Sequence, residues 1–345
     1  MKKKFMAIAA ALCLSCLAMF NANDVAAQKT YNNPVIKSST PDPTVIRAND
    51  GYFYLYGTED MNNMPIYRSR NLVDWTFVGT AFTDATRPKC VRPYTKGMMW
   101  APDINYINGQ YVLYYSIGVW GYGWECGVGG CPTSERPEGP FTDRGVVLMG
   151  RDLNVCNSID QFYIEEGGKK YMVWGSYWGI YIIQLTDDGL RTMPGASPKK
   201  LCNSQLEGSY IHKRNGYYYL IGSNGNCCQD NGNYDVVGYK LIYGRSRSLF
   251  GPYVTKEGKR MLDSPDNYDE LLLPNDICLG PGHNAEWIED DNGDTWMLYH
   301  GYLRSKLELQ RVVWLDQIKW KDDLPYVENN SPSKTSKAPY FKGVD

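Results

Sequence analysis

One short phrase recurs five times along the chain, and this repeat constrains the fold more than any other feature. Each copy begins with a polar or acidic residue and a short strand-like run, passes through a turn glycine, and ends in an aromatic-rich run. The first copy covers residues 42–57, with Gly51 at its turn. The five copies begin at Asp42, Asp103, Asp160, Glu207 and the pair His283 and Asn284.

Each copy has the pattern of a β-hairpin, because two runs of strand-forming residues flank a turn such as Asn-Gly or Asp-Gly. No segment shows a sustained helical period. The copies start roughly 45 to 80 residues apart, which is enough for one four-stranded blade and its loops. We therefore predict an all-β fold, a five-bladed β-propeller that forms one domain over residues 28–345. A β-sandwich would also explain the strands, but not the recurrence of one phrase with an acid at its head.

The first residues have the features of a targeting segment. Residues 2–4 are basic, residues 5–20 are an apolar run, and residues 25–27 are a small-residue cleavage site. This pattern predicts a secretory signal peptide over residues 1–27, and the run is too short for a transmembrane span. We expect an exported protein, periplasmic or extracellular, with no membrane span.

Composition narrows the class of partner. The net charge of −2 gives no field that would attract nucleic acid or anionic lipid. The 28 tyrosines and 10 tryptophans suit strands, and their exposed faces suit sugar rings. We expect a monomer that binds no nucleic acid.

The cysteines fit an exported chain, in which disulfides can form. Cys126 and Cys131 are spaced to bridge across a glycine-rich loop, and Cys227 and Cys228 are adjacent. The full pairing cannot be deduced from spacing. Zinc binding is disfavoured because the chain has no paired Cys-x-x-Cys spacing.

The heads of the repeats predict an active site. The first strand of each propeller blade lines the central channel, so Asp42, Asp103, Asp160 and Glu207 are expected at one mouth. Like charges held close together cannot all ionise freely, and a protonated carboxyl beside an ionised one is what glycosidic cleavage needs. A single Asp before a strand is commonly a backbone cap. Four acids in register favour a functional site instead.

The phrases at these heads resemble glycoside hydrolase family 43. They occur in that family's order, and the similarity continues to Arg311 and residues 315–320. Within the family, the chain is most similar to the arabinan endo-1,5-α-L-arabinosidases. The matching phrases are residues 42–46, 100–103, 158–160, 207–211 and 280–284.

The resemblance implies an inverting mechanism with three carboxylates. Asp42 matches the general base, Glu207 the general acid, and Asp160 the residue that tunes the pKa of the acid and orients it. An inverting enzyme leaves room for water, so the carboxyl groups of Asp42 and Glu207 should lie roughly 6.5–9.5 Å apart. Gln161 stands where the family usually has Pro, and residues 208–209 are Gly-Ser where the family often has Ala-Pro. These departures affect loop geometry and linkage preference.

Four further residues have expected roles. His283 matches a histidine that holds a central metal, often calcium, largely through waters; the alternative is a hydrogen-bonded core histidine. Arg311 matches an arginine that reaches the sugar, and the alternative is a surface salt bridge. Trp100 is a candidate sugar platform next to Asp103, itself a candidate substrate contact. Further candidate platforms are Trp120, Trp124 and Trp178.

Several functions are compatible with these residues. The first is endo-acting hydrolysis of α-1,5-linked arabinan, a plant cell-wall polysaccharide. An exo-acting α-L-arabinofuranosidase or a β-xylosidase would use the same carboxylates, and loops 119–132 and 224–235 would decide between groove and pocket. A non-catalytic glycan-binding propeller or an adhesion scaffold would not need Asp42, Asp160 and Glu207 together.

Overall fold

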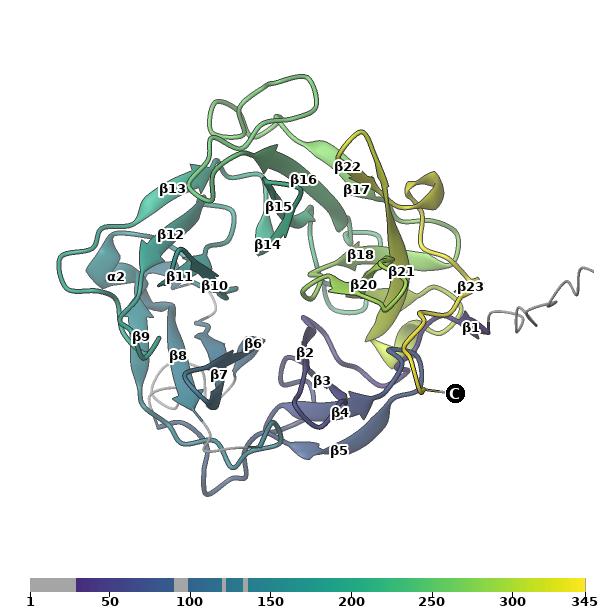
Figure 1. Ribbon diagram of the computed structural model, residues 1–345, viewed down its shortest axis with the longest axis horizontal. Helices are drawn as coiled ribbons and strands as arrows, with labels where there is room; N and C mark the ends of the chain where they lie inside the picture. The colour runs from purple at the N-terminus through teal and green to yellow at the C-terminus, as the bar shows by residue number, and fades with distance from the viewer. Residues whose placement is uncertain (1–28, 90–98, 120–121, 133–135, 345) are drawn as a thin grey trace, which may run out of the picture.

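The protein is a propeller of five β-sheets around a central axis (Figure 1). The computed structural model describes residues 29–89, 99–119, 122–132 and 136–344, so the expected signal peptide lies outside the described residues. Helical structure in the described part is limited to short segments: α2 (Gly150–Leu153), η1 (Gly123–Glu125), η2 (Leu307–Leu309) and η3 (Glu328–Asn330). The prediction of an all-β, five-bladed propeller is confirmed.

The first four blades are antiparallel four-stranded sheets whose spatial order follows the chain. Each begins at the axis and ends at the rim (Figure 1). Their strands are, for blade 1, β2 (Thr44–Arg47), β3 (Phe53–Tyr56), β4 (Pro65–Ser69) and β5 (Thr76–Thr80); for blade 2, β6 (Trp100–Ile107), β7 (Gln110–Ile117), β8 (Gly127–Pro132) and β9 (Val146–Met149); for blade 3, β10 (Phe162–Glu166), β11 (Lys169–Trp174), β12 (Ile180–Gln184) and β13 (Lys199–Cys202); and for blade 4, β14 (Glu207–Arg214), β15 (Tyr217–Asn224), β16 (Lys240–Ser246) and β17 (Asp269–Leu272).

Blade 5 differs because its innermost strand is interrupted. Both β18 (Cys278–Gly282) and β19 (Ile288–Glu289) pair with β20 (Thr295–Leu303), and residues 283–287 lie between them. The blade continues through β21 (Arg311–Lys321) and β22 (Leu324–Tyr326). His283 therefore lies in a break of the strand, free of the β-ladder.

The two ends of the described chain meet at blade 5. β1 (Thr30–Asn32) pairs with β23 (Thr335–Lys337), and Ile36 bridges to Val313 of β21. The hydroxyl of the buried Tyr31 donates to the backbone oxygen of Leu315 at 2.6 Å. These contacts fasten the segment before blade 1 onto the last blade, which closes the ring (Figure 1).

The hydrophobic core lies between neighbouring blades. One cluster joins Tyr56 of blade 1 to Leu113 and Tyr115 of blade 2, and another joins Val173 of blade 3 to Leu220 of blade 4. Many of the aromatic residues lie in such layers, because large flat side chains fill the space between twisted sheets. Most of the tyrosine and tryptophan content therefore stabilises the fold.

A hydrogen bond repeated near the axis joins adjacent blades. In each case a backbone N–H at the start of one blade donates to a side chain at the end of the second strand of the preceding blade. The donors have φ between 40° and 57°, in the left-handed region. The pairs are Ala101 to Thr58 Oγ1 (2.6 Å), Asp160 to Ser116 Oγ (2.9 Å), His283 to Ser223 Oγ (2.7 Å) and Asp42 to His300 Nδ1 (3.0 Å).

The cysteines correct one expectation. Cys227 and Cys228 form a disulfide, whereas Cys126 is a free, buried thiol. Cys126 precedes the extended strand β8, which contains Cys131. Five residues of strand span about 16 Å, well beyond the ~4.4–6.8 Å between Cα atoms that a disulfide allows. The predicted Cys126–Cys131 bridge is wrong.

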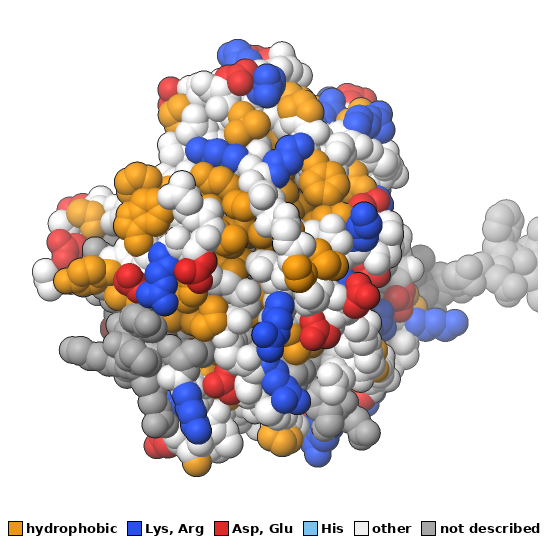
Figure 2. All heavy atoms as spheres, turned by 90° about the vertical axis from the view of Figure 1, so that its left-hand side faces the viewer, with side chains coloured by type: hydrophobic (Ala, Val, Ile, Leu, Met, Phe, Trp, Pro, Cys, Tyr) orange, Lys and Arg blue, Asp and Glu red, His pale blue; other side chains and the backbone are white. Residues whose placement is uncertain are grey.

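The surface of blades 2 and 3 is mixed in character. Figure 2 shows this side, where hydrophobic side chains lie among basic and acidic ones. Within these two blades, Trp124 lies between β7 and β8 and is 50% exposed, and Trp178 lies between β11 and β12 and is 61% exposed. None of the helices in the described part of the chain is long and apolar enough to cross a bilayer.

Candidate active site

Three carboxylates from different blades meet at the axis. Asp42 and Asp160 lie two residues before the inner strands of blades 1 and 3, and Glu207 begins the inner strand of blade 4. Asp160 Oδ2 accepts a hydrogen bond from the backbone N–H of Gly208 at 3.0 Å. The charges of Glu207 and Asp42 both act on Asp160 and contribute to its raised pKa. Side chains far apart in sequence thus form one electrostatic unit.

Asp42 is held in its ionised form. Thr58 donates to its Oδ2 at 2.5 Å, while Nδ1 of His283 and Nη1 of Arg311 lie 3.2 Å and 3.4 Å from its Oδ1. Burial acts to raise the pKa of Asp42, but Arg311 and His283 outweigh it and hold that pKa well below its usual range. An ionised carboxylate at neutral pH suits a general base.

The pKa values of Glu207 and Asp160 are raised, unlike that of Asp42. Burial raises the pKa of Glu207, although the hydroxyls of Ser176 and Tyr239, which donate to its two carboxyl oxygens, lower it. Burial, together with the charges of Glu207 and Asp42, raises the pKa of Asp160 to about 7 against the opposing effect of His283. The site therefore keeps Asp42 ionised and favours a proton on the other carboxyls, which is the division that glycosidic cleavage needs.

Two histidines adjoin Asp42 and differ in charge. Burial alone would lower the pKa of His283, but Asp42 and the other two carboxylates raise it to about 9. Burial lowers the pKa of His300 to about 4, so this ring is neutral. His300 Nδ1 accepts the N–H of Asp42 at 3.0 Å. Sequence reasoning missed His300. A signal was present, because the residue at the corresponding place in each of the other blades carries a hydroxyl group: Thr58, Ser116, Ser176 and Ser223.

Comparison with known proteins identifies the family. Residues 31–325 match the sequence profile of Glycosyl hydrolases family 43. The chain belongs to this family. It is a glycoside hydrolase, and its three carboxylates occupy a site of the kind that such an enzyme requires.

Relatives of this family 43 enzyme are named for action on arabinan or its linkages. The chain is 31% identical to the probable arabinan endo-1,5-α-L-arabinosidase C of Aspergillus clavatus, over 88% of this chain and 97% of that protein. It is 30% identical to the extracellular exo-α-(1→5)-L-arabinofuranosidase ArbA of Cellvibrio japonicus, over 80% of this chain and 82% of that protein. A structure of Cellvibrio cellulosa α-L-arabinanase complexed with arabinohexaose has a TM-score of 0.74 at 27% identity, and covers 84% of this chain and 95% of that one.

Asp103 does not share the mouth with the other three acids of this family 43 enzyme. By the hydrogen bonds between blades, Ala101 corresponds to Asp42 and Asp160, and Asp103 lies two residues further along β6. It is 1% exposed and accepts hydrogen bonds from Tyr163 N–H, Asn105 Nδ2 and Tyr210 OH. The expectation of four carboxylates at one mouth is thus wrong for Asp103, whose enclosure suits a structural role better than sugar contact.

Arg311 and Trp100, the two other predicted sugar contacts, each begin a strand and are largely or partly buried. Arg311 begins β21 and its side chain is 14% exposed, so its contact with Asp42 is no surface salt bridge. Trp100 begins β6 and is half-buried, and its ring covers Gly118 so closely that a Cβ there would overlap it. Sugar contact by either residue stays a prediction. Trp120 lies outside the described residues.

The side chains around His283 do not fit a calcium ion chelated by protein. Calcium takes about six to eight oxygen ligands, and the described residues contain no group of three or more His, Cys, Asp or Glu that could hold a metal ion. His283 Nδ1 faces Asp42, and the raised pKa of His283 keeps the ring protonated. A calcium ion held by His283 and waters stays a prediction.

The loop between β15 and β16 is tied to both neighbouring blades. The hydroxyl of Tyr177 in blade 3 donates to the oxygen of Gly225, and Tyr234 donates to the oxygen of Leu307 in blade 5 at 3.2 Å. The Cys227–Cys228 disulfide lies between these two anchors. The loop is thereby fixed beside Tyr239, the partner of Glu207.

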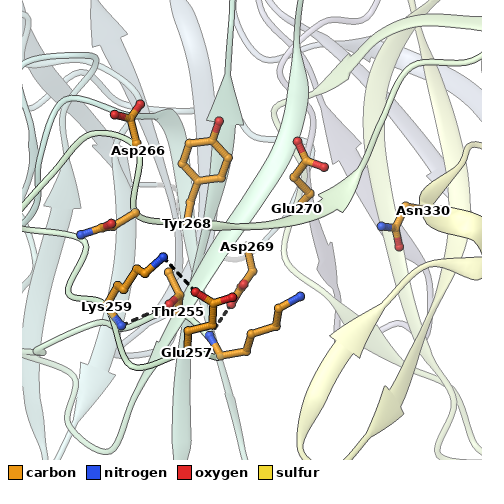
Figure 3. Close-up of a pocket in the computed structure, with 10 residues that line it drawn as sticks. Thr255, Glu257, Lys259, Asp266, Tyr268, Asp269, Glu270 and Asn330 are labelled. Carbon is orange, nitrogen blue, oxygen red and sulfur yellow. Dashed lines mark hydrogen bonds and ion pairs between the residues drawn. The ribbon is translucent and has the colours of Figure 1, made fainter.

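A separate hollow lies at the outer edge of blade 4. It is lined by charged and polar side chains that include Glu257, Lys259, Asp266 and Tyr268, with Asn330 on its far side (Figure 3). Neither Asp42 nor Asp160 nor Glu207 lines it. This hollow is therefore distinct from the candidate active site.

Proposed function

We propose that the chain hydrolyses α-1,5-linked L-arabinofuranosyl chains of arabinan, cutting within the chain and inverting the anomeric carbon. The observation that carries this proposal is the different surroundings of the two carboxyls: the cationic side chains of His283 and Arg311 lie 3.2 Å and 3.4 Å from Asp42, whereas the hydroxyls of Ser176 and Tyr239 bind Glu207. The substrate is supported by the names of the Aspergillus clavatus relative and the Cellvibrio cellulosa arabinanase. The exo-acting Cellvibrio japonicus relative gives a second candidate, an exo-acting α-L-arabinofuranosidase.

The proposed reaction assigns one proton transfer to each of two carboxyls. Glu207 gives its proton to the leaving glycosidic oxygen as the bond to the anomeric carbon breaks. A water molecule attacks that carbon from the opposite face, and Asp42 takes a proton from this water. Arg311 and His283 keep Asp42 ionised beforehand, and burial together with the negative charge of Asp42 favours the protonated form of Glu207.

Exposed aromatic residues support binding of an extended sugar chain. Trp124 and Trp178, exposed by 50% and 61%, lie in segments that follow the second strands of blades 2 and 3. At the ends of the same two second strands, Ser116 accepts the backbone N–H of Asp160 and Ser176 donates to the carboxylate of Glu207. We propose that these rings contact sugar units away from the cleaved bond.

Product sizing during early digestion of linear α-1,5-arabinan tests the mode of action. A mixture of arabino-oligosaccharides supports endo-action, and arabinose alone from the first minutes would support the exo-acting candidate. Glu207→Gln should lower the rate of hydrolysis by about 10²–10⁴-fold, while the variant still binds arabino-oligosaccharide. Full activity of this variant would refute the assignment of the acid. Binding with no hydrolysis by the wild-type protein would indicate a glycan-binding propeller.

We further propose that the protein is exported and acts as a monomer. The Cellvibrio japonicus relative is named extracellular, and the N-terminal residues have the signal-peptide pattern described above. Cell fractionation and light scattering of the purified protein test these two statements. Retention in the cytoplasm, or a dimer mass, would contradict them.

A further inference from the structure

His300 joins the last blade to the first with a ring where other blade junctions use a hydroxyl. Its Nδ1 accepts the backbone N–H of Asp42, whereas the acceptors at other junctions are Thr58, Ser116 and Ser223. A hydroxyl would satisfy the same kind of N–H. The presence of a larger side chain at this junction therefore requires another reason.

The face of the His300 ring supplies that reason. The ring is fully buried and lies parallel to the ring of Tyr239, with centroids 5.7 Å apart and 10° between the planes. Nε2 of His300 has no hydrogen-bond partner among the described residues. A buried polar group without a partner destabilises a fold. The unpartnered Nε2 is therefore unfavourable, and it does not explain why a histidine stands at this junction. On one side the ring contacts Asp42, through the backbone N–H and through Oδ1, which lies 3.2 Å from its Nδ1, and on the other side it packs against Tyr239.

Tyr239 extends this contact to the acid. It precedes β16, is 2% exposed, and its hydroxyl donates to Oε1 of Glu207. The hydroxyl of Ser176 donates to Oε2 of the same carboxyl. An unbroken series of contacts thus runs from Asp42 through His300 and Tyr239 to Glu207.

We propose that His300 and Tyr239 are positioning residues that act as one unit and fix the acid relative to the base. This inference rests on the proposed roles of Asp42 and Glu207. His300 holds the backbone of the base and packs against Tyr239, which in turn orients the acid. When Glu207 gives its proton to the leaving oxygen, the Tyr239 hydroxyl donates to the carboxylate that forms.

The Tyr239→Phe variant isolates the hydroxyl because it keeps the stacked ring. Two substrates of equal length are compared, an arabino-oligosaccharide and one that carries a 4-nitrophenyl leaving group. An acidic phenol needs little protonation to leave, so loss of support for the acid should affect it least. We expect kcat to fall about 10- to 100-fold on the plain oligosaccharide, with KM nearly unchanged, and by less than about threefold on the activated one.

Tyr114→Phe is the matched control. Tyr114 is equally buried, and its hydroxyl donates to the oxygen of Gly189 at 2.8 Å rather than to Asp42, Asp160 or Glu207. This variant should keep activity on both substrates. An equal loss on both substrates in Tyr239→Phe, or a similar loss in Tyr114→Phe, would overturn the proposal.

A double-mutant cycle tests whether the pair acts as a unit. His300→Asn keeps an acceptor near the Nδ1 position and removes the ring. Combined with Tyr239→Phe, it should reduce kcat little further than the more damaging single change. If the fold losses in kcat of the two single variants instead multiply in the double variant, His300 and Tyr239 do not act as one unit. If His300→Asn does not fold, the leaving-group comparison with Tyr239→Phe still decides. A wild-type protein that cleaves neither substrate would refute the proposed function itself.

Discussion

Replacing Arg311 by Met should move the acidic limb of the pH–activity profile upward. Nη1 of Arg311 lies 3.4 Å from Oδ1 of Asp42. Two unit charges at this distance interact by about 5 kcal/mol at an effective dielectric constant of ~20. His283 remains and the site relaxes, so the pKa of Asp42 should rise by about 1–3 units rather than by the full ~3.5.

The sign of the effect follows from the role of Asp42. The base acts only when ionised, and Arg311 holds its pKa well below the usual range. Without the guanidinium, kcat/KM on arabino-oligosaccharide should begin to fall at a higher pH as the solution is acidified. The measurement is kcat/KM of wild type and variant between pH 3 and pH 9.

Arg311→Lys is the control for this prediction. Lys keeps a positive charge but loses the forked geometry, so its acidic limb should stay close to that of wild type even if KM rises. An acidic limb that does not move in Arg311→Met would refute the reasoning. It would mean that Asp42 does not depend on Arg311 for its ionisation or is not the base.

Three further predictions concern stability and the metal. Burial raises the folded-state pKa of Asp103 to about 7, above its unfolded value, so the stability that its protonated form contributes at low pH is lost as the pH rises towards 7. Between pH 5 and 8, the unfolding free energy of wild type should therefore fall by about 2 kcal/mol more than that of Asp103→Asn. Equal pH dependence of the two proteins in denaturant titrations would contradict this. Ser116→Ala, which removes the acceptor for Asp160 N–H, should cost about 1–3 kcal/mol in the same titrations, and an unchanged midpoint would argue against these junctions. If calcium binds at His283 through waters, EDTA should lower the activity of wild type and added calcium should restore it, whereas the activity of His283→Ala should respond to neither. Wild-type activity that is insensitive to EDTA would exclude this role of calcium.

The fold could be predicted from sequence because the evidence for it is local. Each hairpin contains its own turn, and five copies of one hairpin leave few architectures other than a propeller. Asp42, Asp160 and Glu207 were predictable because each stands at the head of a copy. The same reasoning failed for Asp103 because it aligned the acids themselves. The hydrogen bonds between blades instead align Ala101 with Asp42 and Asp160, so Asp103 lies two residues further along its strand.

His300 and Tyr239 were missed for a different physical reason. Both lie within or next to strands rich in aromatic and aliphatic residues, where a buried side chain fits the local pattern. The contact of His300 with Asp42 joins residues 258 positions apart, and the stack on Tyr239 joins two blades. Alignment of the ends of the second strands offers one signal, because Ser116, Ser176 and Ser223 occupy the place of His300.

The stereochemistry of the first product tests the central claim most directly. If Asp42 activates water while Glu207 protonates the leaving oxygen, water attacks the anomeric carbon once and inverts it. Proton NMR of linear α-1,5-arabinan digested with a high concentration of the protein should show the β-anomer of the new reducing end first, with the α-anomer appearing only by mutarotation. Initial appearance of the α-anomer would contradict direct attack by water and with it the roles given to Asp42 and Glu207.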